Sequence, residues 1–307
     1  MKEIVKKILY KMKMLNYIKY FRIRIKCIYM EYKYNTVRKK EKYIQKIFQK
    51  SLGYNIDFLK KPETFNQKIQ FRKLYDDNPL YSICADKYRA REYVKEKIGE
   101  EYLIPLYLVT DKLTLEQWEK LPNSFVAKAN HNSGPVQIVK DKNKVKSKEI
   151  INELNRQLKI DYGIISMEKY YSDIPRKIIV EKYLKDNIED YKFNCFNHGE
   201  KIILERVTKA SELSNMYNPY TWKKLDFTTG NIVDRTKYDK PKNFDKMIEI
   251  ARTLSSDFDY VRVDLYNVDG NIYVGEMTFC ESSGFGKFTD ESWDYKFGEY
   301  WHQSKLK

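Results

Sequence analysis

One segment, Tyr260–Gly284, combines a strand pattern with charged side chains that could do chemistry. Its sequence is YVRVDLYNVDGNIYVGEMTFCESSG. Apolar and polar residues alternate at its start, which predicts a strand whose polar face carries Arg262 and Asp264. The pair Asp269-Gly270 is typical of a tight turn. We therefore expect a β-hairpin with an arginine and a carboxylate on one face.

The returning strand, residues 271–278, brings a second carboxylate, Glu276, to this hairpin. A three-residue connection would place Glu276 directly opposite Asp264, whereas a two-residue connection would offset the pair and turn the side chains apart. Ile272 and Val274 would share the face of Glu276. Two facing carboxylates can bind Mg²⁺ through oxygen, together with substrate phosphates. The alternative is a surface hairpin whose charges are simply solvated.

A second candidate site is the polar loop 130–134, of sequence NHNSG, which follows a predicted strand at 125–129. Lys128 lies on this strand and is expected to point toward the loop. Backbone N–H groups and hydroxyls of such a loop can bind phosphate oxygens, while the ammonium group neutralises their charge. Loops of Asn, Ser and Gly also join ordinary hairpins, so a simple connection is the alternative.

The elements predicted around these residues indicate how the chain could position them. The second half reads mainly as an antiparallel sheet with helices on one face, because short alternating stretches are separated by turn residues. Together with helices in the first half, this predicts an α+β fold. We expect helices at 65–74, 85–97, 115–121, 148–158 and 244–254, and further strands at 102–109, 138–140, 178–180, 190–196 and 201–206.

Composition excludes several kinds of site. The chain of 307 residues has four scattered cysteines without a CxxC pair, which argues against a disulfide framework or a zinc site and indicates a reducing compartment. With only three histidines, a His-rich metal site is excluded. The 27 Tyr and 15 Phe supply much of the apolar area for a core. No run of 18 apolar residues and no signal-peptide pattern is present, so we expect a cytoplasmic protein.

Basic charge is concentrated in residues 1–50, which hold 16 Lys/Arg and 3 Asp/Glu, so that the other 257 residues carry only +2 of the net +15. Apolar residues recur every three or four positions and predict a basic amphipathic helix. Such a helix is typical of an anionic membrane surface, with packing on the protein's own body or on a second subunit as the alternative. No nucleic-acid motif accompanies the charge, so we expect no nucleic-acid partner. The apolar positions are Ile4, Ile8, Met12, Leu15, Ile18, Phe21, Ile25, Ile28 and Tyr32.

Several short stretches, in order, resemble ATP-grasp enzymes, and in particular the TupA-like ATP-grasp family, named for a teichuronopeptide biosynthesis protein. They are KPETFNQKIQFRKLYDDNPLY, LPNSFVAKANHNSG, VEKYL, DYKFNCF, FDYVRVDLYNVDGNIYVGE and SSGFGKF. The resemblance covers roughly residues 52–300. The resemblance implies an ATP-grasp fold, in which two α+β subdomains hold ATP between them. We expect a basic helical segment at 1–50, a helical region at 51–122, a nucleotide-binding subdomain at 123–183, and a subdomain with the metal and acceptor sites at 184–307.

The resemblance also implies roles for residues around ATP. Two lysines, Lys87 in a predicted helix and Lys128, would contact the phosphates beside Ser133 and Gly134 of the polar loop. Other residues would surround the base and the ribose. The implied contacts are Glu181 to the adenine amino group, the backbone of Tyr183 and Leu184 along the ring, Asp190 to the ribose, and Lys192 to a phosphate or the substrate.

Further implied roles concern Mg²⁺ and the transferred group. Asp264 and Glu276 would be the metal ligands, and Arg262 would hold the transferred phosphoryl group and the acyl phosphate. The acceptor would lie against Ser282, Ser283 and Gly284.

The chain departs from the family pattern in two places. Thr278 stands where an asparagine is common near the metal, so one amide ligand is lost and a second metal ion has weaker support. In the polar loop, family members commonly read NHGSG, whereas this chain has NHNSG followed by Pro135. Asn132 tolerates a positive φ better than most residues, but Pro135 removes a backbone N–H group and stiffens the loop. The phosphate contacts of the loop are therefore expected to differ from those of the family.

The implied reaction joins a carboxylate to an amine at the expense of ATP. The carboxylate becomes an acyl phosphate, and the amine attacks it to give an amide, ADP and phosphate. The family's link to cell-surface polysaccharide assembly implies a carboxylate-bearing glycan or lipid-linked precursor as acceptor, and an amino acid or other amine, at the inner face of the cytoplasmic membrane. The alternatives are a phosphotransferase acting on a sugar hydroxyl, a glycosyltransferase, and a binding module without catalysis.

Overall fold

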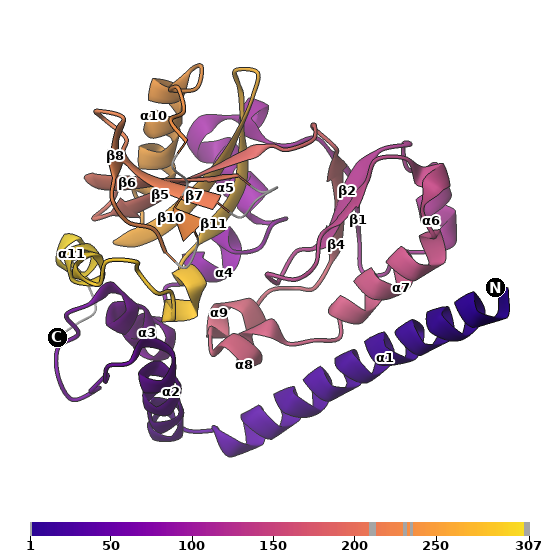
Figure 1. The fold of residues 1–307 in the computed structure, drawn as a ribbon, viewed down its shortest axis with the longest axis horizontal. Helices are drawn as coiled ribbons and strands as arrows, with labels where there is room; N and C mark the ends of the chain where they lie inside the picture. Colours follow the sequence, from indigo (N-terminus) through magenta and orange to yellow (C-terminus); the bar gives the residue numbers. More distant parts are fainter. Residues whose placement is uncertain (1, 209–212, 230–231, 234–235, 304–307) are drawn as a thin grey trace.

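Two sheets, each covered by helices, make up the body of the protein (Figure 1). The computed structural model describes residues 2–208, 213–229, 232–233 and 236–303, with only the backbone described for 2–17 and 232–233. The strand pairs are antiparallel, except that β7 and β9 run parallel. The expected α+β fold is therefore confirmed.

The smaller sheet has four strands in the order β1-β4-β2-β3. One face packs on α6 (Leu115–Lys120) and α7 (Ser147–Gln157) through a core that includes Trp118, Phe125 and Leu154. The opposite face is left to line the space between the sheets. The strands are β1 (Leu106–Thr110), β2 (Phe125–Ala129), β3 (Gln137–Val139) and β4 (Ile178–Lys182).

The larger sheet has seven strands in the order β11-β10-β5-β6-β7-β8, with β9 beside β7. One face packs on α5 (Ala90–Ile98) and α10 (Phe244–Ser255), as expected. The opposite face packs on α3 (Phe65–Tyr75) and α11 (Ser292–Tyr300) through Phe196, Ile203 and Tyr260, so the expectation that helices lie on one face alone is wrong. Its strands are β5 (Glu189–Phe196), β6 (Lys201–Thr208), β7 (Leu213–Asn218), β8 (Lys223–Leu225), β9 (Ile232–Val233), β10 (Tyr260–Val268) and β11 (Asn271–Thr278).

Shorter helices connect the sheets and close the ends of the larger one. Of these, sequence patterning predicted only α3, whose capping box of Thr64 and Gln67 is present. The others are too short for a helical period to stand out. The helices are α3 (Phe65–Tyr75), α4 (Leu80–Cys84), α8 (Tyr162–Ser166), α9 (Lys169–Ser172) and α11 (Ser292–Tyr300), with single 3₁₀ turns η1 (Glu100–Tyr102), η2 (Lys142–Lys144) and η3 (Glu281–Gly284).

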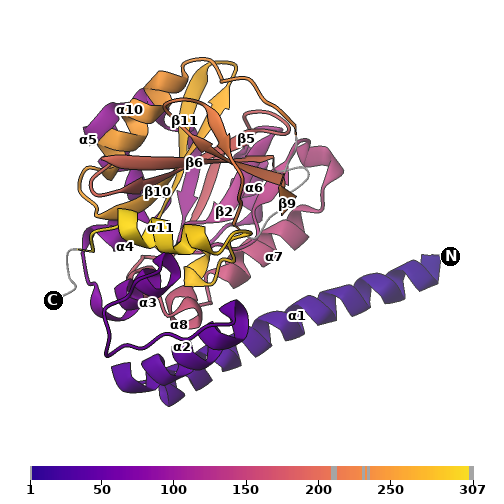
Figure 2. The same ribbon diagram turned by 60° about the vertical axis from the view of Figure 1, so that its left-hand side comes forward.

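The N-terminal segment forms two helices, α1 (Lys2–Lys33) and α2 (Val37–Leu52), with Thr36 as the N-cap of the second. α1 is a long rod along one side of the molecule and contacts α8 (Figures 1 and 2). The side chains of Ile4, Ile8, Met12 and Leu15 in the predicted stripe lie outside the described residues. Within the described residues, no helix has the length and apolar character needed to cross a membrane.

The β10–β11 hairpin corrects one detail of the predicted register. Its turn has two residues, Asp269-Gly270, yet Asp264 still lies directly opposite Glu276. A bulge explains this, because Leu265 pairs with Val274 and leaves Gly275 as the extra residue.

The bulge also changes which face each side chain occupies. In a regular strand, Ile272 and Met277 would point to opposite faces, because they are an odd number of residues apart. In this strand both lie in the core beneath the sheet, whereas Glu276 lies on the opposite face. The expectation that Ile272 and Val274 share the face of Glu276 is therefore wrong. Gly275 suits the bulge because a Cβ there would lie 2.9 Å from the ring of Tyr266.

A buried arginine ties the base of this hairpin to α3. Arg72 donates to the backbone carbonyls of Tyr260 and Phe279 at 2.8 and 3.0 Å and forms an ion pair with Asp259. Its guanidinium group also lies 4.3 Å from the ring centroid of Trp301. The start of β10 and the end of β11 are thus fixed against one helix.

Candidate active site

A cavity of about 810 Å³ lies between the two sheets. Apolar side chains line much of it, among them Val126 and Ile138 of the smaller sheet and Tyr266 of the larger one. Mostly apolar pockets of this size with a few placed polar groups are typical of ligand sites. Three residues expected to contact the base, Glu181, Tyr183 and Leu184, line this cavity.

Lys128 lies on the cavity wall and is paired with a carboxylate. Its side chain faces the cavity because alternate residues of β2 face the core of the smaller sheet. Lys128 Nζ lies 2.7 Å from Glu181 Oε2, and Arg91 Nη1 lies 3.7 Å from Glu181 Oε1. Glu181 is therefore held between two cations at the edge of the apolar space.

Strand register aligns four charged residues in one row across the larger sheet. Asp264 on β10 lies between Glu276 on β11 and Lys192 on β5, and Lys192 lies opposite Glu205 on β6. Glu205 is 2% exposed and its Oε1 atom has no hydrogen-bond partner among the described residues. Sequence analysis missed Glu205, since nothing in the alternation of β6 distinguishes it from a solvated glutamate.

Arg262 holds the middle of this face in place. It donates twice to Asp264, from Nε and Nη2, with both distances 2.6 Å, and it also pairs with Glu281. Burial would lower the pKa of Arg262, but the neighbouring carboxylates Asp264 and Glu276 raise it above its ordinary value. The guanidinium is therefore a permanent cation with a fixed plane.

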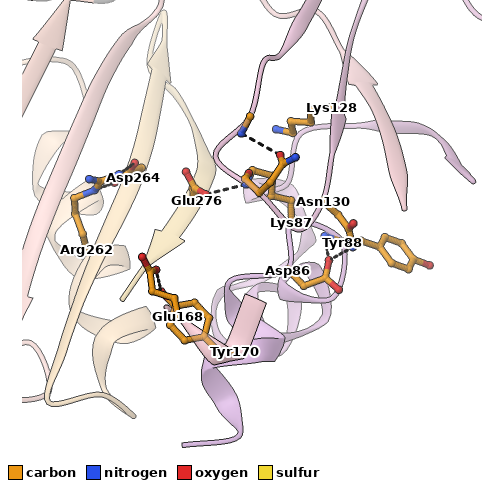
Figure 3. Close-up of polar contacts among 12 residues, drawn as sticks. Asp86, Lys87, Tyr88, Lys128, Asn130, Glu168, Tyr170, Arg262, Asp264 and Glu276 are labelled. Atoms are coloured by element: carbon orange, nitrogen blue, oxygen red, sulfur yellow. Dashed lines mark hydrogen bonds and ion pairs between the residues drawn. The ribbon is translucent and has the colours of Figure 1, made fainter. Parts of the chain in front are cut away.

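Lys87 joins the two halves of the site. Its Nζ atom lies 2.9 Å from Glu276 Oε1 and donates to the backbone carbonyl of Asn132 at 2.9 Å (Figure 3). Burial alone would raise the pKa of Glu276, but Lys87, Arg262 and Lys128 outweigh it and lower that pKa. Glu276 is thus held as a carboxylate, the form that binds a metal.

Lys87 does not lie in a helix, contrary to the expectation for residues 85–97. It lies in the turn between α4 and α5, where Asp86 accepts a hydrogen bond from the backbone of Tyr88 at 2.9 Å. This aspartate side chain offers the backbone an alternative to the helical hydrogen bond, so the helix starts at Ala90.

The polar loop after β2 is anchored by buried side chains. Asn130 accepts from the backbone of Lys177 at 2.7 Å and donates to Asp86 at 2.7 Å and to the carbonyl of Pro175 at 2.9 Å. His131 is fully buried, and burial lowers its pKa to about 4. Ser133 and Gly134, the residues expected at the phosphates, follow directly on this anchor (Figure 3 shows Asn130 beside Lys87).

The residues expected at the acceptor lie in η3, at the end of the hairpin. Ser282 and Ser283 have φ angles of 47° and 53°, a strained conformation that often marks functional sites. Ser283 Oγ lies 3.0 Å from Lys73 Nζ and donates to Glu168 Oε1 at 2.8 Å. Gly284 instead packs against α3, where a Cβ would lie 2.4 Å from Gln70 Nε2.

Two charged residues next to Ser283 were missed in the sequence. Glu168 is 3% exposed and Lys73 is 8% exposed. Burial raises the pKa of Glu168 and lowers that of Lys73, and each group partly offsets the shift of the other. Both lie in segments read as ordinary polar positions, and only the packing of α3 on η3 brings them together.

The remaining expected residues, Asp190 and Thr278, lie on either side of the charged row, each two residues away from it along its strand. Asp190 on β5 is opposite Tyr266, whose ring lines the cavity. Burial and nearby carboxylates, Asp190 first among them, raise the pKa of Tyr266 well above its ordinary value. Thr278 lies opposite Arg262 on the same face as Glu276.

The donor set fits Mg²⁺ that is shared with a phosphate ligand. Among the described residues, no group of three His, Cys, Asp or Glu side chains could hold a metal ion by itself. Asp264 and Glu276 provide two carboxylates that face each other across neighbouring strands. Because Mg²⁺ usually takes one or two protein carboxylates and completes its shell with phosphate and water, two are sufficient.

Comparison with known proteins identifies the fold of this site. The model of the family described as TupA-like ATPgrasp matches residues 67–302. A comparison with curated proteins gave no significant match. The chain is similar to a D-alanine–D-alanine ligase from Helicobacter pylori, with 14% identity, a TM-score of 0.42, and coverage of 76% of this chain and 68% of that one.

Two further solved structures are similar at lower coverage. The D-alanine–D-alanine ligase from Bacillus anthracis, complexed with ATP, is 19% identical and has a TM-score of 0.34. The similarity covers 64% of this chain and 53% of that one. The ATP-grasp ligase PsnB, complexed with a minimal precursor, Mg and ADP, is 11% identical and has a TM-score of 0.34. The similarity covers 67% of this chain and 52% of that one. The chain thus spans about half the length of these two proteins.

Proposed function

The chain belongs to the TupA-like ATP-grasp family, and on that premise we propose that it is an ATP- and Mg²⁺-dependent carboxylate–amine ligase. The reaction forms an acyl phosphate on an acceptor carboxylate, which an amino acid or another amine converts to an amide with release of ADP and phosphate. The acceptor is a carboxylate-bearing cell-surface polysaccharide or its precursor. The work is done on the cytoplasmic side, where ATP is available.

One observation carries this proposal. The facing carboxylates Asp264 and Glu276 lie on one wall of the site and Lys128 lies on the other, with Lys87 in contact with both sides. The apolar cavity continues beyond Lys128. A nucleotide needs these three features in this order: an apolar slot for its base, cations for its phosphates, and carboxylates that hold a metal on them.

In this proposal, different residues of the chain bind the base, the phosphates and the metal. The peptide groups at Tyr183 and Leu184 hold the base, with Glu181 on its amino group. Lys87 and Lys128 exchange their carboxylate partners for phosphate oxygens. Asp264 and Glu276 would hold Mg²⁺, which, when bound, neutralises charge on the transferred phosphoryl group.

Arg262 suits an acyl phosphate better than a simple alcohol as acceptor. Its planar guanidinium can hold a pair of oxygens bidentately, as a carboxylate or phosphoryl group presents them. Lys73, which contacts Ser283, adds a second cation on the acceptor side. Two cations on that side favour an anionic acceptor, and this supports a carboxylate-bearing glycan.

The reaction is tested with hydroxylamine, which traps an acyl phosphate as a hydroxamate and leaves a sugar phosphate unchanged. Acceptors are first screened as carboxylate sugars and oligosaccharides by ADP release with ATP and Mg²⁺. With a working acceptor, the hydroxamate should form in amounts that match ADP. A phosphorylated acceptor that resists hydroxylamine would show a phosphotransferase instead, and the Glu276→Gln variant serves as the inactive control.

A further inference from the structure

The described part of α1 presents two different apolar faces. Tyr20, Cys27 and Ile23 pack toward Ile160 and Ile164, so one face is used by the body of the protein. A second face points away from it. Its side chains are Phe21, Ile25, Ile28, Tyr29 and Tyr32, and they are 55%, 51%, 66%, 51% and 82% exposed.

This outward face has the form of a membrane-binding surface. At 100° per residue its side chains, with Ile18, cover an arc of about 100° on the helix. Lys19, Arg22, Lys26 and Lys33 follow directly along one side of that arc, and Arg24 lies on the other. Glu31 is the only acidic residue between 18 and 33, so the charge beside the apolar arc is positive.

The turn between α1 and α2 extends this surface. A hollow of about 600 Å³ lies there, lined by Lys33, Lys39, Lys42 and Lys46 together with Tyr32 and Tyr43. Tyr32 belongs to both the outward face and the hollow. None of the ion pairs between described residues involves Lys42 or Lys46, so both ammonium groups are free to meet an anion there.

We propose that the outward face of α1 and the lysine-lined hollow dock this protein onto an anionic lipid bilayer. Exposed aromatic and aliphatic side chains enter the boundary of the acyl chains, while the lysines and arginines contact lipid phosphates. The opposite face of α1 stays on α8, along the side of the body (Figure 2). The docked helix would therefore lie in the plane of the membrane and join the membrane to the body. A nucleic acid would match the charge and leave the apolar arc in water.

Vesicle co-sedimentation of the full-length protein tests this docking. The protein should bind vesicles of phosphatidylcholine with phosphatidylglycerol and should bind phosphatidylcholine alone much more weakly. Added salt should weaken the binding. Equal binding to both kinds of vesicle, or no binding to either, would overturn the proposal.

Two groups of variants separate the apolar from the basic contribution. The triple variant Phe21→Ser, Ile25→Ser and Ile28→Ser should lose about tenfold or more in vesicle affinity per side chain. The triple variant Lys19→Gln, Arg22→Gln and Lys26→Gln should lose about fivefold per charge. Because all six positions lie on the exposed part of α1, unchanged melting temperatures should accompany these losses.

Matched controls lie elsewhere on the surface. Leu59→Ser removes an apolar side chain that is 97% exposed, and should leave binding unchanged. The triple variant Lys60→Gln, Lys120→Gln and Lys144→Gln removes the same charge from side chains that are 79%, 74% and 83% exposed. If these controls lose as much affinity as the α1 variants, or if the serine variant instead turns a stable dimer into a monomer, the face does not serve a membrane.

Discussion

The two sheets present charge to the same cleft in different ways. On the larger sheet, Arg262 and Asp264 are buried, doubly hydrogen-bonded and set by strand register against Glu276. On the smaller sheet, Lys128 is a single ammonium group near the end of a short strand, and one ion pair with Glu181 holds it. In the proposed function, the larger sheet would fix the geometry of the reacting group, whereas the smaller sheet would adapt to the nucleotide.

The strongest test of this comparison is Glu276→Gln. It removes a proposed metal carboxylate from the rigid side, so ADP release should fall by about 10²–10³ or more through kcat, with the fold intact. The matched control is Glu291→Gln on the exposed surface, which should have full activity. Wild-type ADP release by Glu276→Gln at saturating Mg²⁺ would contradict the metal assignment.

Lys128→Met tests the adaptable side. Loss of one phosphate cation should reduce kcat/KM for ATP by about 10². If the smaller sheet mainly serves nucleotide binding, a larger share of the loss in kcat/KM should come from a raised KM in Lys128→Met than in Glu276→Gln. Steady-state kinetics with varied ATP distinguish the two, with the exposed Lys120→Met as the control; a loss confined to kcat would break the comparison.

Lys87→Met probes the contact between the two sides through its pH dependence. Lys87 is the largest of the influences that lower the pKa of Glu276 against burial, so its removal should raise that pKa. A carboxylate with a lowered pKa stays charged until the pH falls to that pKa, so a carboxylate with a higher pKa is protonated at a higher pH. The acid limb of the pH–rate profile should therefore move to higher pH in Lys87→Met and stay in place in Lys95→Met, whose pair with Glu100 is exposed.

Asn130→Ala should act on the stability of the loop rather than on the chemical step. The change leaves the half-buried backbone N–H of Lys177 and the buried carboxylate of Asp86 without this partner, which typically costs about 1–3 kcal/mol. Urea unfolding measures the loss, and the exposed Asn143→Ala should stay within about 0.5 kcal/mol of the parent protein. An unchanged midpoint for Asn130→Ala would show that the loop is not anchored there.

The smallest expected effect belongs to Thr278→Asn. The amide adds an oxygen ligand on the face of Glu276, so the Mg²⁺ concentration for half-maximal ADP release should fall a few-fold. Thr278→Val offers no ligand and should need as much Mg²⁺ as the parent protein, or more. A lower requirement in the valine variant would place the effect outside metal binding.

Much of the fold was predictable because its elements carry local signals. The helix at 65–74, the turn pair Asp269-Gly270 and the strands β5 and β10 each depend on neighbours in the chain, and each was confirmed. The register of the β10–β11 hairpin, in contrast, does not follow from neighbours in the chain. The bulge at Gly275 depends on the ring of Tyr266 across the sheet, which no spacing rule along one strand reveals.

The candidate site shows the same division. Lys128, Arg262, Asp264 and Glu276 stood out because their charges interrupt apolar strands. Glu168 and Lys73 did not, since both lie in ordinary polar stretches and become a buried pair only through the packing of α3 against η3. Their importance comes from desolvation, a property that sequence patterning does not report.

The pairing of charges within the cleft has a consequence for the order of binding. Lys87, Lys128 and Arg262 already hold carboxylates, so a phosphate that takes the lysines must release Glu276 and Glu181 into the same small space. A divalent cation that arrives with the phosphate neutralises the carboxylates set free, while either ligand alone leaves uncompensated charge behind. Nucleotide and metal should therefore show strong reciprocal linkage, each raising the affinity for the other by the same factor.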